Sequence, residues 1–337
     1  LPNFSRAWGV LGDIYDRMGD RDKGTELTLK ARNLASRADD LLRSGSELEA
    51  KGKLEEALEK YLAAIDTDPS FPSAWYNLAH VYEKMNRLED ALNAFDRVIR
   101  IAPDDIFAWN KRVSILKKMK KYDEAIASYD IMIELDPKKK LFWFWKARTA
   151  EEAGKYDIVL ECCNKVLEID PKDTYALLYQ AQINIKLENY DKAIESYRKI
   201  IEIDPSNLDA YLGLADLYSR KLNNIEEAIK IIDGALERDP DNATLWYKKG
   251  EIKLLTGDEE EALKFFEKAI EKNMMYVDAW VRRAEIYEKR GDMDKAAESY
   301  EALTKIKSSD PNTWYLRAKF MAKIGKIKDA LKFVDRA

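Results

Sequence analysis

Residues 72–105, PSAWYNLAHVYEKMNRLEDALNAFDRVIRIAPDD, hold one copy of a pattern that recurs along the chain. Counted from its first residue, the copy has Trp75 at position 4, Ala79 at position 8, Ala91 at position 20 and Pro103 at position 32. The same positions return at an interval of 34 residues, as tryptophan at Trp75, Trp109 and Trp143 and again at Trp246, Trp280 and Trp314, and as proline at Pro69, Pro103, Pro137, Pro171 and Pro205. Such a period predicts a stacked array of one supersecondary unit rather than the single core of a globular enzyme.

Each unit reads as two helices joined by a tight turn. Apolar residues at positions 4, 7, 8 and 11 form one helical face, and positions 20, 24 and 27 form a second. Position 15, between them, holds a residue that tolerates the left-handed backbone at the end of a helix. It is Gly19, Gly52, Gly154, Gly257, Gly291 and Gly325 in six units and Asn86 in a seventh. A proline, preceded by aspartate in most units, closes the pattern, since proline cannot extend the helix before it.

These tryptophan, small-residue, tyrosine, alanine, aromatic and proline positions resemble the tetratricopeptide repeat (TPR) family over nearly the whole chain. The resemblance implies an all-α fold, a right-handed α-solenoid (superhelix) of about nine full helix-turn-helix repeats plus a truncated tenth. We expect one solenoid over residues 1–337. Its expected repeats are 5–37, 38–71, 72–105, 106–139, 140–173, 174–207, 208–242, 243–276, 277–310 and the partial 311–337.

Local departures from the pattern predict irregular helix ends. The first unit is about one residue short and lacks both the alanine at position 20 and the Asp-Pro. The unit that starts at Leu208 carries an extra residue around 222–224, and the unit from Val277 has Ser308 where proline is expected. Leu1-Pro2 resembles the tail of a preceding repeat and Ala337 falls within a second helix, so we expect a fragment of a longer array.

Composition excludes several classes of function. The chain has 337 residues, 35% of them charged, with a net charge of -5, which argues against a nucleic-acid surface. No apolar run approaches the ~20 residues that span a membrane. His80 is the only histidine, and the glycines do not cluster into a phosphate-binding loop, so we expect no enzyme, cofactor or metal site. Cys162 and Cys163 are adjacent, which favours buried thiols and a cytoplasmic location.

A partner is expected on the first helices, which line the inner surface in the TPR family. Positions 2, 5, 6, 9 and 12 adjoin the core face and form a stripe along that surface. In the middle of the chain the stripe is apolar, with Phe107, Leu141, Phe144, Trp145, Tyr175, Leu178 and Tyr179. Two interpretations stay open. These side chains pack against neighbouring helices, with Phe142 at a usually small position, or they form an apolar groove for a partner's helix or extended peptide.

Further along, the same stripe turns acidic and is interrupted by Lys248 and Arg282. Its acidic residues are Asp209, Asp216, Glu251, Asp278, Glu285 and Glu288. It is either a solvated face or a surface that steers a basic segment of the partner. The clamp that some TPR proteins use for acidic C-terminal tails is absent in register. Asn77 matches its middle element, but Tyr76, Phe107 and Lys111 stand at the other positions.

The predicted function is therefore a protein–protein interaction scaffold that binds a partner peptide or helix in its groove. Three alternatives remain: a regulatory or substrate-docking arm of a larger enzyme or assembly, an RNA-binding helical array, and self-association through the C-terminal helix. The acidic balance counts against the RNA-binding array.

Overall fold

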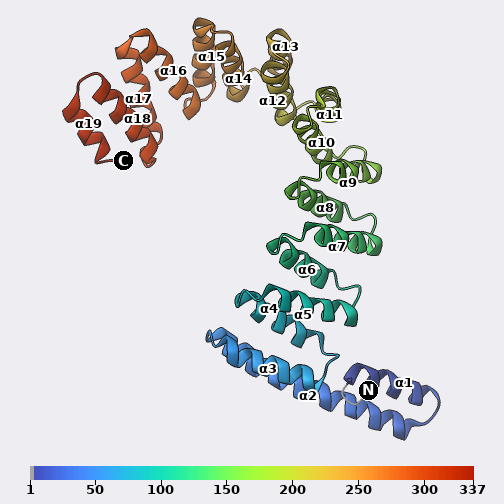
Figure 1. The fold of residues 1–337 in the computed structure, drawn as a ribbon. Helices are drawn as coiled ribbons and strands as arrows, with labels where there is room; N and C mark the ends of the chain where they lie inside the picture. Colours follow the sequence, from blue (N-terminus) through green and yellow to red (C-terminus); the bar gives the residue numbers. More distant parts are fainter. Residues whose placement is uncertain (1–3) are drawn as a thin grey trace. The chain divides into compact units, whose positions relative to one another are not determined.

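The computed structural model describes residues 4–337, and every regular element in that range is a helix (Figure 1). The expected all-α class is confirmed. The chain divides into two compact units, Leu1–Pro171 and Lys172–Ala337, which are described separately below.

Unit 1 contains nine of these helices in sequence. They are α1 (Ser5–Arg17), α2 (Arg21–Ala50), α3 (Leu54–Thr67), α4 (Pro72–Lys84), α5 (Leu88–Ile101), α6 (Ile106–Lys118), α7 (Tyr122–Leu135), α8 (Lys140–Glu152) and α9 (Tyr156–Ile169). From α4 onward they form antiparallel hairpins whose first helices start at the expected repeat starts. Figure 1 shows α4 to α9 as successive pairs.

Unit 2 continues the same alternation of first and second helices. Its elements are α10 (Thr174–Lys186), α11 (Tyr190–Ile203), α12 (Leu208–Asp216), the π-helical turn η1 (Leu217–Lys221), α13 (Ile225–Leu236), α14 (Ala243–Leu255), α15 (Glu259–Lys272), α16 (Val277–Arg290), α17 (Met293–Ile306), α18 (Pro311–Lys323) and α19 (Ile327–Val334).

The turn inside each hairpin depends on one residue with positive φ at position 15. Gly154 has φ 72° and Asn86 has φ 58°, as the sequence predicts. Lys120 and Glu188 adopt the same conformation, with φ 59° in both, although neither residue type favours it. The repeat therefore imposes the left-handed turn even where glycine is missing.

Small residues at position 8 let the two helices of a hairpin approach closely. A Cβ built on Gly250 would lie 2.6 Å from Cε1 of Phe266, the position-24 residue of the same repeat. Phe266 is fully buried. The aromatic ring thus fills the space that glycine leaves, which is the close packing the sequence pattern requires.

The first hairpin differs from the expected arrangement, because the boundary expected at residues 37 and 38 lies inside the continuous 30-residue helix α2. One reason is that the first repeat has no Asp-Pro to end its second helix. A second reason is the polarity of the residues at the repeat contact. Thr28 stands at position 24 of the first repeat, where the other full repeats have an aromatic, cysteine or isoleucine, and Asp40 and Glu47 stand at positions 3 and 10 of the second repeat. Both carboxylates are exposed. Neither the first nor the second repeat has an apolar surface at this contact against which the other could stack. The helix α2 therefore continues through the expected boundary.

As a result, α1 and α3 both pack along α2 (Figure 1). The start of α1 meets the end of α3, where Ser5 N donates to Asp68 Oδ1 at 3.3 Å and the Ser5 hydroxyl donates to the same carboxylate. Arg6 Nη1 reaches the carbonyl of Ile101 at 2.8 Å. These bonds fix the first hairpin to the rest of unit 1.

The extra residue expected around 222–224 is absorbed slightly earlier, in η1. Leu222 N donates to the carbonyl of Leu217 at 3.1 Å, a bond that spans five residues and widens the last turn of the helix. Asn223 then takes φ 50°, and the Asn224 side chain accepts from Glu227 N at 3.1 Å to start α13.

Candidate partner-binding site

In unit 1, ion pairs join the first helices of neighbouring repeats. Lys84 on α4 lies 2.9 Å from Glu49 on α2, and Lys118 on α6 pairs with Glu83 on α4. In both pairs, a lysine at position 13 meets a glutamate at position 12 of the preceding repeat. These contacts place the first helices side by side on one face, here called the groove face.

An apolar patch lies on the groove face at the other end of these helices. We call Tyr76, Phe107, Leu141 and Trp145 the groove patch. Phe107 is 59% exposed and Leu141 is 45% exposed, although both are large apolar side chains. The Phe107 ring lies 5.6 Å from that of Tyr76, and Lys111 Nζ lies 5.4 Å from its centroid. The patch therefore offers apolar surface beside a cation.

Tyr76 is held in place by the loop that precedes α6. Its hydroxyl donates to Asp105 Oδ2 at 2.6 Å, while Asp105 Oδ1 accepts from Ala108 N at 3.0 Å and caps α6. Burial raises the pKa of Tyr76, and the hydrogen bond to Asp105 raises it further, so the phenol stays protonated. The tyrosine is thus a fixed support for the exposed Phe107 ring.

Packing accounts for other members of the expected apolar stripe. Trp145 is half-buried, with its ring 5.7 Å from that of the fully buried Phe142 and 6.4 Å from that of Tyr129. Phe144 is half-buried as well. Within unit 1, Trp145 packs against its neighbours, whereas Phe107 and Leu141 are exposed.

The remaining three apolar residues of the stripe lie on α10 in unit 2. Tyr175 is 62% exposed, and its ring lies 6.3 Å from that of Tyr179. Leu178 and Tyr179 are half-buried. The stripe is thus divided, with Phe107, Leu141, Phe144 and Trp145 on one unit and three residues on the other.

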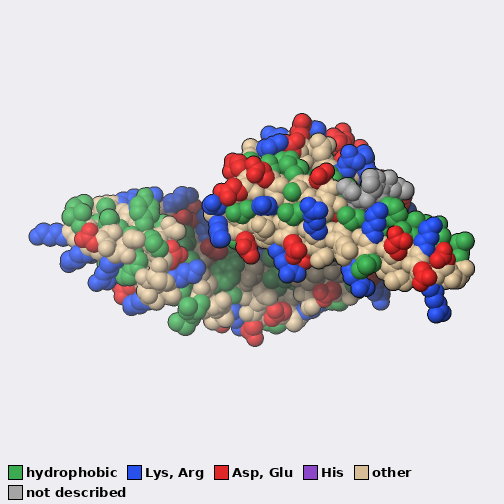
Figure 2. Space-filling model, turned by 90° about the horizontal axis from the view of Figure 1, so that it is seen from below, with side chains coloured by type: hydrophobic (Ala, Val, Ile, Leu, Met, Phe, Trp, Pro, Cys, Tyr) green, Lys and Arg blue, Asp and Glu red, His purple; other side chains and the backbone are tan. Residues whose placement is uncertain are grey.

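Four acidic residues of the stripe, Asp216, Glu251, Glu285 and Glu288, pair with cations. Lys248 Nζ lies 3.3 Å from Asp216 and 2.8 Å from Glu251, so one ammonium bridges the two carboxylates. Arg220, which lies in η1, pairs with Asp216 at 3.0 Å, and Arg282 Nη1 lies 3.0 Å from Glu285. Figure 2 likewise shows acidic and basic side chains interspersed on the face in view. The sequence shows Lys248 and Arg282 on this stripe, and the structure adds that they pair with its carboxylates, which weakens the negative field.

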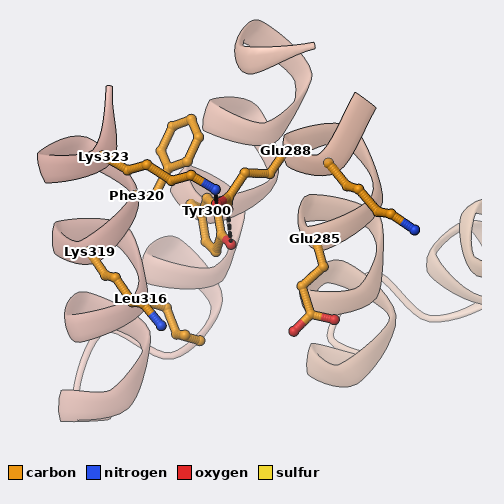
Figure 3. A pocket seen from close by; sticks show the side chains of 8 residues that line it. Glu285, Glu288, Tyr300, Leu316, Lys319, Phe320 and Lys323 are labelled. Carbon is orange, nitrogen blue, oxygen red and sulfur yellow. Dashed lines mark hydrogen bonds and ion pairs between the residues drawn. The ribbon is translucent and has the colours of Figure 1, made fainter. Parts of the chain in front are cut away.

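A cavity of about 720 Å³ opens between α16, α17 and α18 in unit 2. Figure 3 shows Glu285 and Glu288 on one wall and Lys319 and Lys323 on the other. Glu288 accepts from Tyr300 at 3.0 Å and from Lys323 at 2.5 Å. Tyr300, Leu316 and Phe320 also line this space. It combines an apolar surface with charges of both signs.

The lysine–glutamate pairs between first helices are contacts that the sequence analysis does not identify. The two members of each pair are 35 residues apart in the sequence, one more than the repeat length. The pairs are Lys84–Glu49, Lys118–Glu83 and Lys323–Glu288. A comparison of residues at this spacing would therefore find them. The expected stripe ends at position 12 and so leaves out the lysine at position 13 of the next repeat.

His80 and the two cysteines have structural surroundings. His80 Nδ1 lies 2.8 Å from Glu49 Oε1 on the groove face. Cys162 and Cys163 are buried, and burial raises the pKa of Cys162 to about 12. Over residues 4–337, the side chains gather no group of three metal-binding residues, and no helix is long and apolar enough to cross a bilayer.

The stacked hairpins, the left-handed turns and the position-8 contacts define a helical-repeat protein. Sequence models of the TPR repeat match residues 45–86, 72–105, 111–174, 184–252 and 253–320. The chain belongs to the tetratricopeptide repeat family.

Several solved structures resemble the chain in part. A tetratricopeptide repeat protein from Parabacteroides merdae ATCC 43184 is 21% identical over 74% of this chain and 98% of its own, with a TM-score of 0.41. PilW, a type IV pilus biogenesis factor, is 19% identical over 58% of this chain and 90% of its own, with a TM-score of 0.43. MamA from Desulfovibrio magneticus RS-1 is 18% identical over 51% of this chain and 97% of its own, with a TM-score of 0.38. No curated protein matches the sequence. Similarity at this level gives no support to a particular partner.

Proposed function

We propose that the protein is a non-catalytic scaffold that holds a protein partner on the first-helix face of its repeats. Membership of the TPR family supports a role in protein interaction. One observation carries the assignment of the surface: Phe107 and Leu141, both at position 2 of consecutive repeats, are 59% and 45% exposed. Exposed apolar side chains that recur at the same position of consecutive first helices are candidates for an interaction site.

The partner's chemistry follows from the groove patch. Phe107 and Leu141 present apolar area, while Lys111 beside the Phe107 ring presents a positive charge. An extended peptide or helix with apolar anchors and an acidic residue near one of them complements this surface. The ion pairs at positions 12 and 13 lie at the far end of the same helices. They therefore stand at the edge of the proposed binding surface, not at its centre.

The unit 2 face is a second region of the same scaffold. Tyr175 is exposed on α10, and Asp216, Glu251 and Glu285 stand on α12, α14 and α16. Because cations already pair with these carboxylates, we infer that they set the orientation of a partner rather than provide a strong attractive field.

The test is a selection of displayed random peptides on the 1–337 chain, followed by titration of the selected peptide against variants. Phe107→Ser together with Leu141→Ser removes the exposed apolar area at little cost in packing. A matched control, Leu62→Ser together with Ile131→Ser, removes exposed apolar side chains from second helices instead. We expect roughly a five- to 150-fold loss of affinity for the groove variant only, since two partly buried apolar anchors contribute on the order of 1 to 3 kcal/mol. Equal loss in the control, or unchanged binding in both, would reject this surface.

A further inference from the structure

In unit 1, three side chains converge on one carboxylate between α2 and α4. The Tyr61 hydroxyl donates to Glu49 Oε2 at 2.8 Å, and Lys84 Nζ lies 2.9 Å from Glu49 Oε1. His80, at position 9 of the third repeat, brings its Nδ1 to 2.8 Å from the same oxygen. The Glu49 side chain is therefore only 12% exposed.

The same contact recurs in unit 2 with a different neighbour. Tyr300 donates to Glu288 at 3.0 Å and Lys323 donates to it at 2.5 Å, from the same repeat positions as in unit 1. Position 9 of the tenth repeat, however, is Lys319. Within residues 4–337, no hydrogen bond or ion pair joins Lys319 to Glu288 or to any other side chain. The cavity of about 720 Å³ opens at this place.

This cavity lies between two stacked repeats. Its walls come from α16, α17 and α18, and each of these helices packs against the helix before it and the helix after it. The buried rings of Tyr300 and Phe320, 5.0 Å apart, give it a fixed floor, and the half-buried Leu316 presents apolar surface beside them. Because α16 and α18 are first helices, the cavity opens on the first-helix face of its repeats. Its volume is within the ~300 to 1,000 Å³ of typical ligand sites.

Most charged groups around the cavity already have a partner. Glu285 lies 3.0 Å from Arg282, and Lys289 pairs with Glu259. Lys319 is the exception among the residues that line the cavity, and it is exposed. Figure 3 shows it on the wall opposite Glu285. The charge left unused in the cavity is thus one ammonium, which favours a carboxylate over a cation as the group that binds there.

We propose that this cavity is a second binding site of the scaffold, for a partner segment in which an aromatic or aliphatic residue lies within two residues of an aspartate or glutamate. The apolar side chain packs on Leu316, and the carboxylate pairs with Lys319. These two residues are three apart on α18, so they lie on one side of the helix about one turn apart, within reach of one short segment. The inference rests on the proposed scaffold function, but it does not involve the groove patch.

The test separates this cavity from the groove patch. Displayed random peptides are selected on the 1–337 chain that carries Phe107→Ser and Leu141→Ser. Peptides that also bind this chain with Lys319→Glu added are removed. Lys319 is exposed and has no partner among the described side chains, so the fold is retained, which circular dichroism verifies.

Fluorescence anisotropy then measures the affinity of synthetic copies of the enriched peptides. We expect each of them to contain the apolar and acidic residues. Lys319→Ala should lower the affinity about two- to fivefold, as for an exposed ion pair. The control Lys328→Glu, at an exposed lysine of the second helix α19, should leave it unchanged.

A change in the peptide tests direct contact. When its acidic residue is replaced by the matching amide, Lys319→Ala should cause no further loss, because the two substitutions remove the same ion pair. When the acidic residue is replaced by lysine, the peptide should bind the Lys319→Glu chain more tightly than the chain that keeps Lys319.

Other outcomes overturn the proposal. These are a selection that enriches no peptide, enriched peptides without an acidic residue, equal losses for Lys319→Glu and Lys328→Glu, or losses that simply add in the amide peptide. The scaffold function is scored on its own. Peptides selected on the wild type that lose affinity in the Phe107→Ser, Leu141→Ser variant support it even if this cavity binds nothing.

Discussion

Trp109 donates its indole Nε1–H to the backbone carbonyl of Pro103, six residues earlier, at 2.9 Å. The bond recurs in five further repeats, as Trp75 to Pro69 at 3.0 Å, Trp143 to Pro137 at 3.2 Å, Trp246 to Pro240 at 2.8 Å, Trp280 to Met274 at 2.8 Å and Trp314 to Ser308 at 2.7 Å. In the last two the acceptor residue is not proline. The tryptophan therefore needs the carbonyl at this point of the loop, and the repeat tolerates the loss of proline there.

Removal of this hydrogen bond should weaken the repeat measurably. Trp109→Phe keeps an aromatic ring but has no N–H donor, so we expect the free energy of unfolding to fall by about 1 kcal/mol. Trp109→Ala also removes packing and should cost roughly 3 kcal/mol. Urea unfolding of both variants measures the difference. Equal losses for Phe and Ala would show that the hydrogen bond, not the ring, holds the loop.

Two glycines should respond to alanine in opposite directions. Gly250 has no room for a Cβ, which would meet Phe266 at 2.6 Å, so Gly250→Ala should destabilise the protein by roughly 1 to 3 kcal/mol. Gly234, inside α13, has no atom within 4 Å of an added Cβ. Gly234→Ala should stabilise by about 0.5 to 1 kcal/mol, because it reduces the conformational freedom of the unfolded chain. Thermal unfolding of the pair checks both signs. A stable Gly250→Ala variant would mean that the helices of this hairpin can separate without loss.

The continuity of α2 can be broken at an exposed site. Ser36 lies near the middle of this helix, and Ser36→Pro removes one backbone hydrogen bond and clashes with the preceding turn, at a cost of about 3 kcal/mol. We expect faster amide hydrogen exchange in α1 and the first half of α2, with little change from α4 onward. The control Ser36→Ala should retain protection. If α1 stays protected in the proline variant, the bonds of Ser5 and Arg6 hold it without the continuous helix.

Glu49 should make part of the stability depend on pH. Burial raises the pKa of its carboxyl, but hydrogen bonds from Lys84, Tyr61 and His80 outweigh this and lower it below the ordinary 4.5. A carboxyl with a lowered pKa in the folded state stabilises the fold above its unfolded pKa, and this contribution is lost as the pH falls through the folded value. Glu49→Gln should therefore be less stable than the wild type at neutral pH, with a gap that narrows in acid. A gap that is constant with pH would show that the charge of Glu49 is irrelevant.

Much of the fold follows from positions that every repeat shares. The tryptophan, the alanine at position 20 and the turn at position 15 predict the hairpins from α4 onward, because local helical periodicity and close packing both depend on them. The sequence analysis did not predict that α2 is continuous, because this depends on whether the facing residues of two adjacent repeats are apolar enough to pack together. The polar Thr28, Asp40 and Glu47 signal it, but only when the facing positions of neighbouring repeats are compared.

The candidate site was less predictable than the fold. Spacing alone placed Phe107 and Trp145 on one stripe, but the exposure of Phe107 and the packing of Trp145 depend on the rings around them. Likewise, Asp216, Lys248 and Glu251 are all visible on the stripe in the sequence, but the sequence does not show that Lys248 bridges the two carboxylates. Which charged side chains pair with each other depends on which residues lie close together in the folded structure.

The most direct test of the scaffold account is photo-crosslinking in the source cells, with a photoreactive amino acid at position 141 in one variant and at position 131 in another. Leu141 belongs to the groove patch, whereas Ile131 is exposed on the second helix α7. The account predicts a protein adduct from position 141 that is lost when Phe107→Ser is added, and none from position 131. The same adduct from position 131, or no protein adduct from position 141, would contradict it.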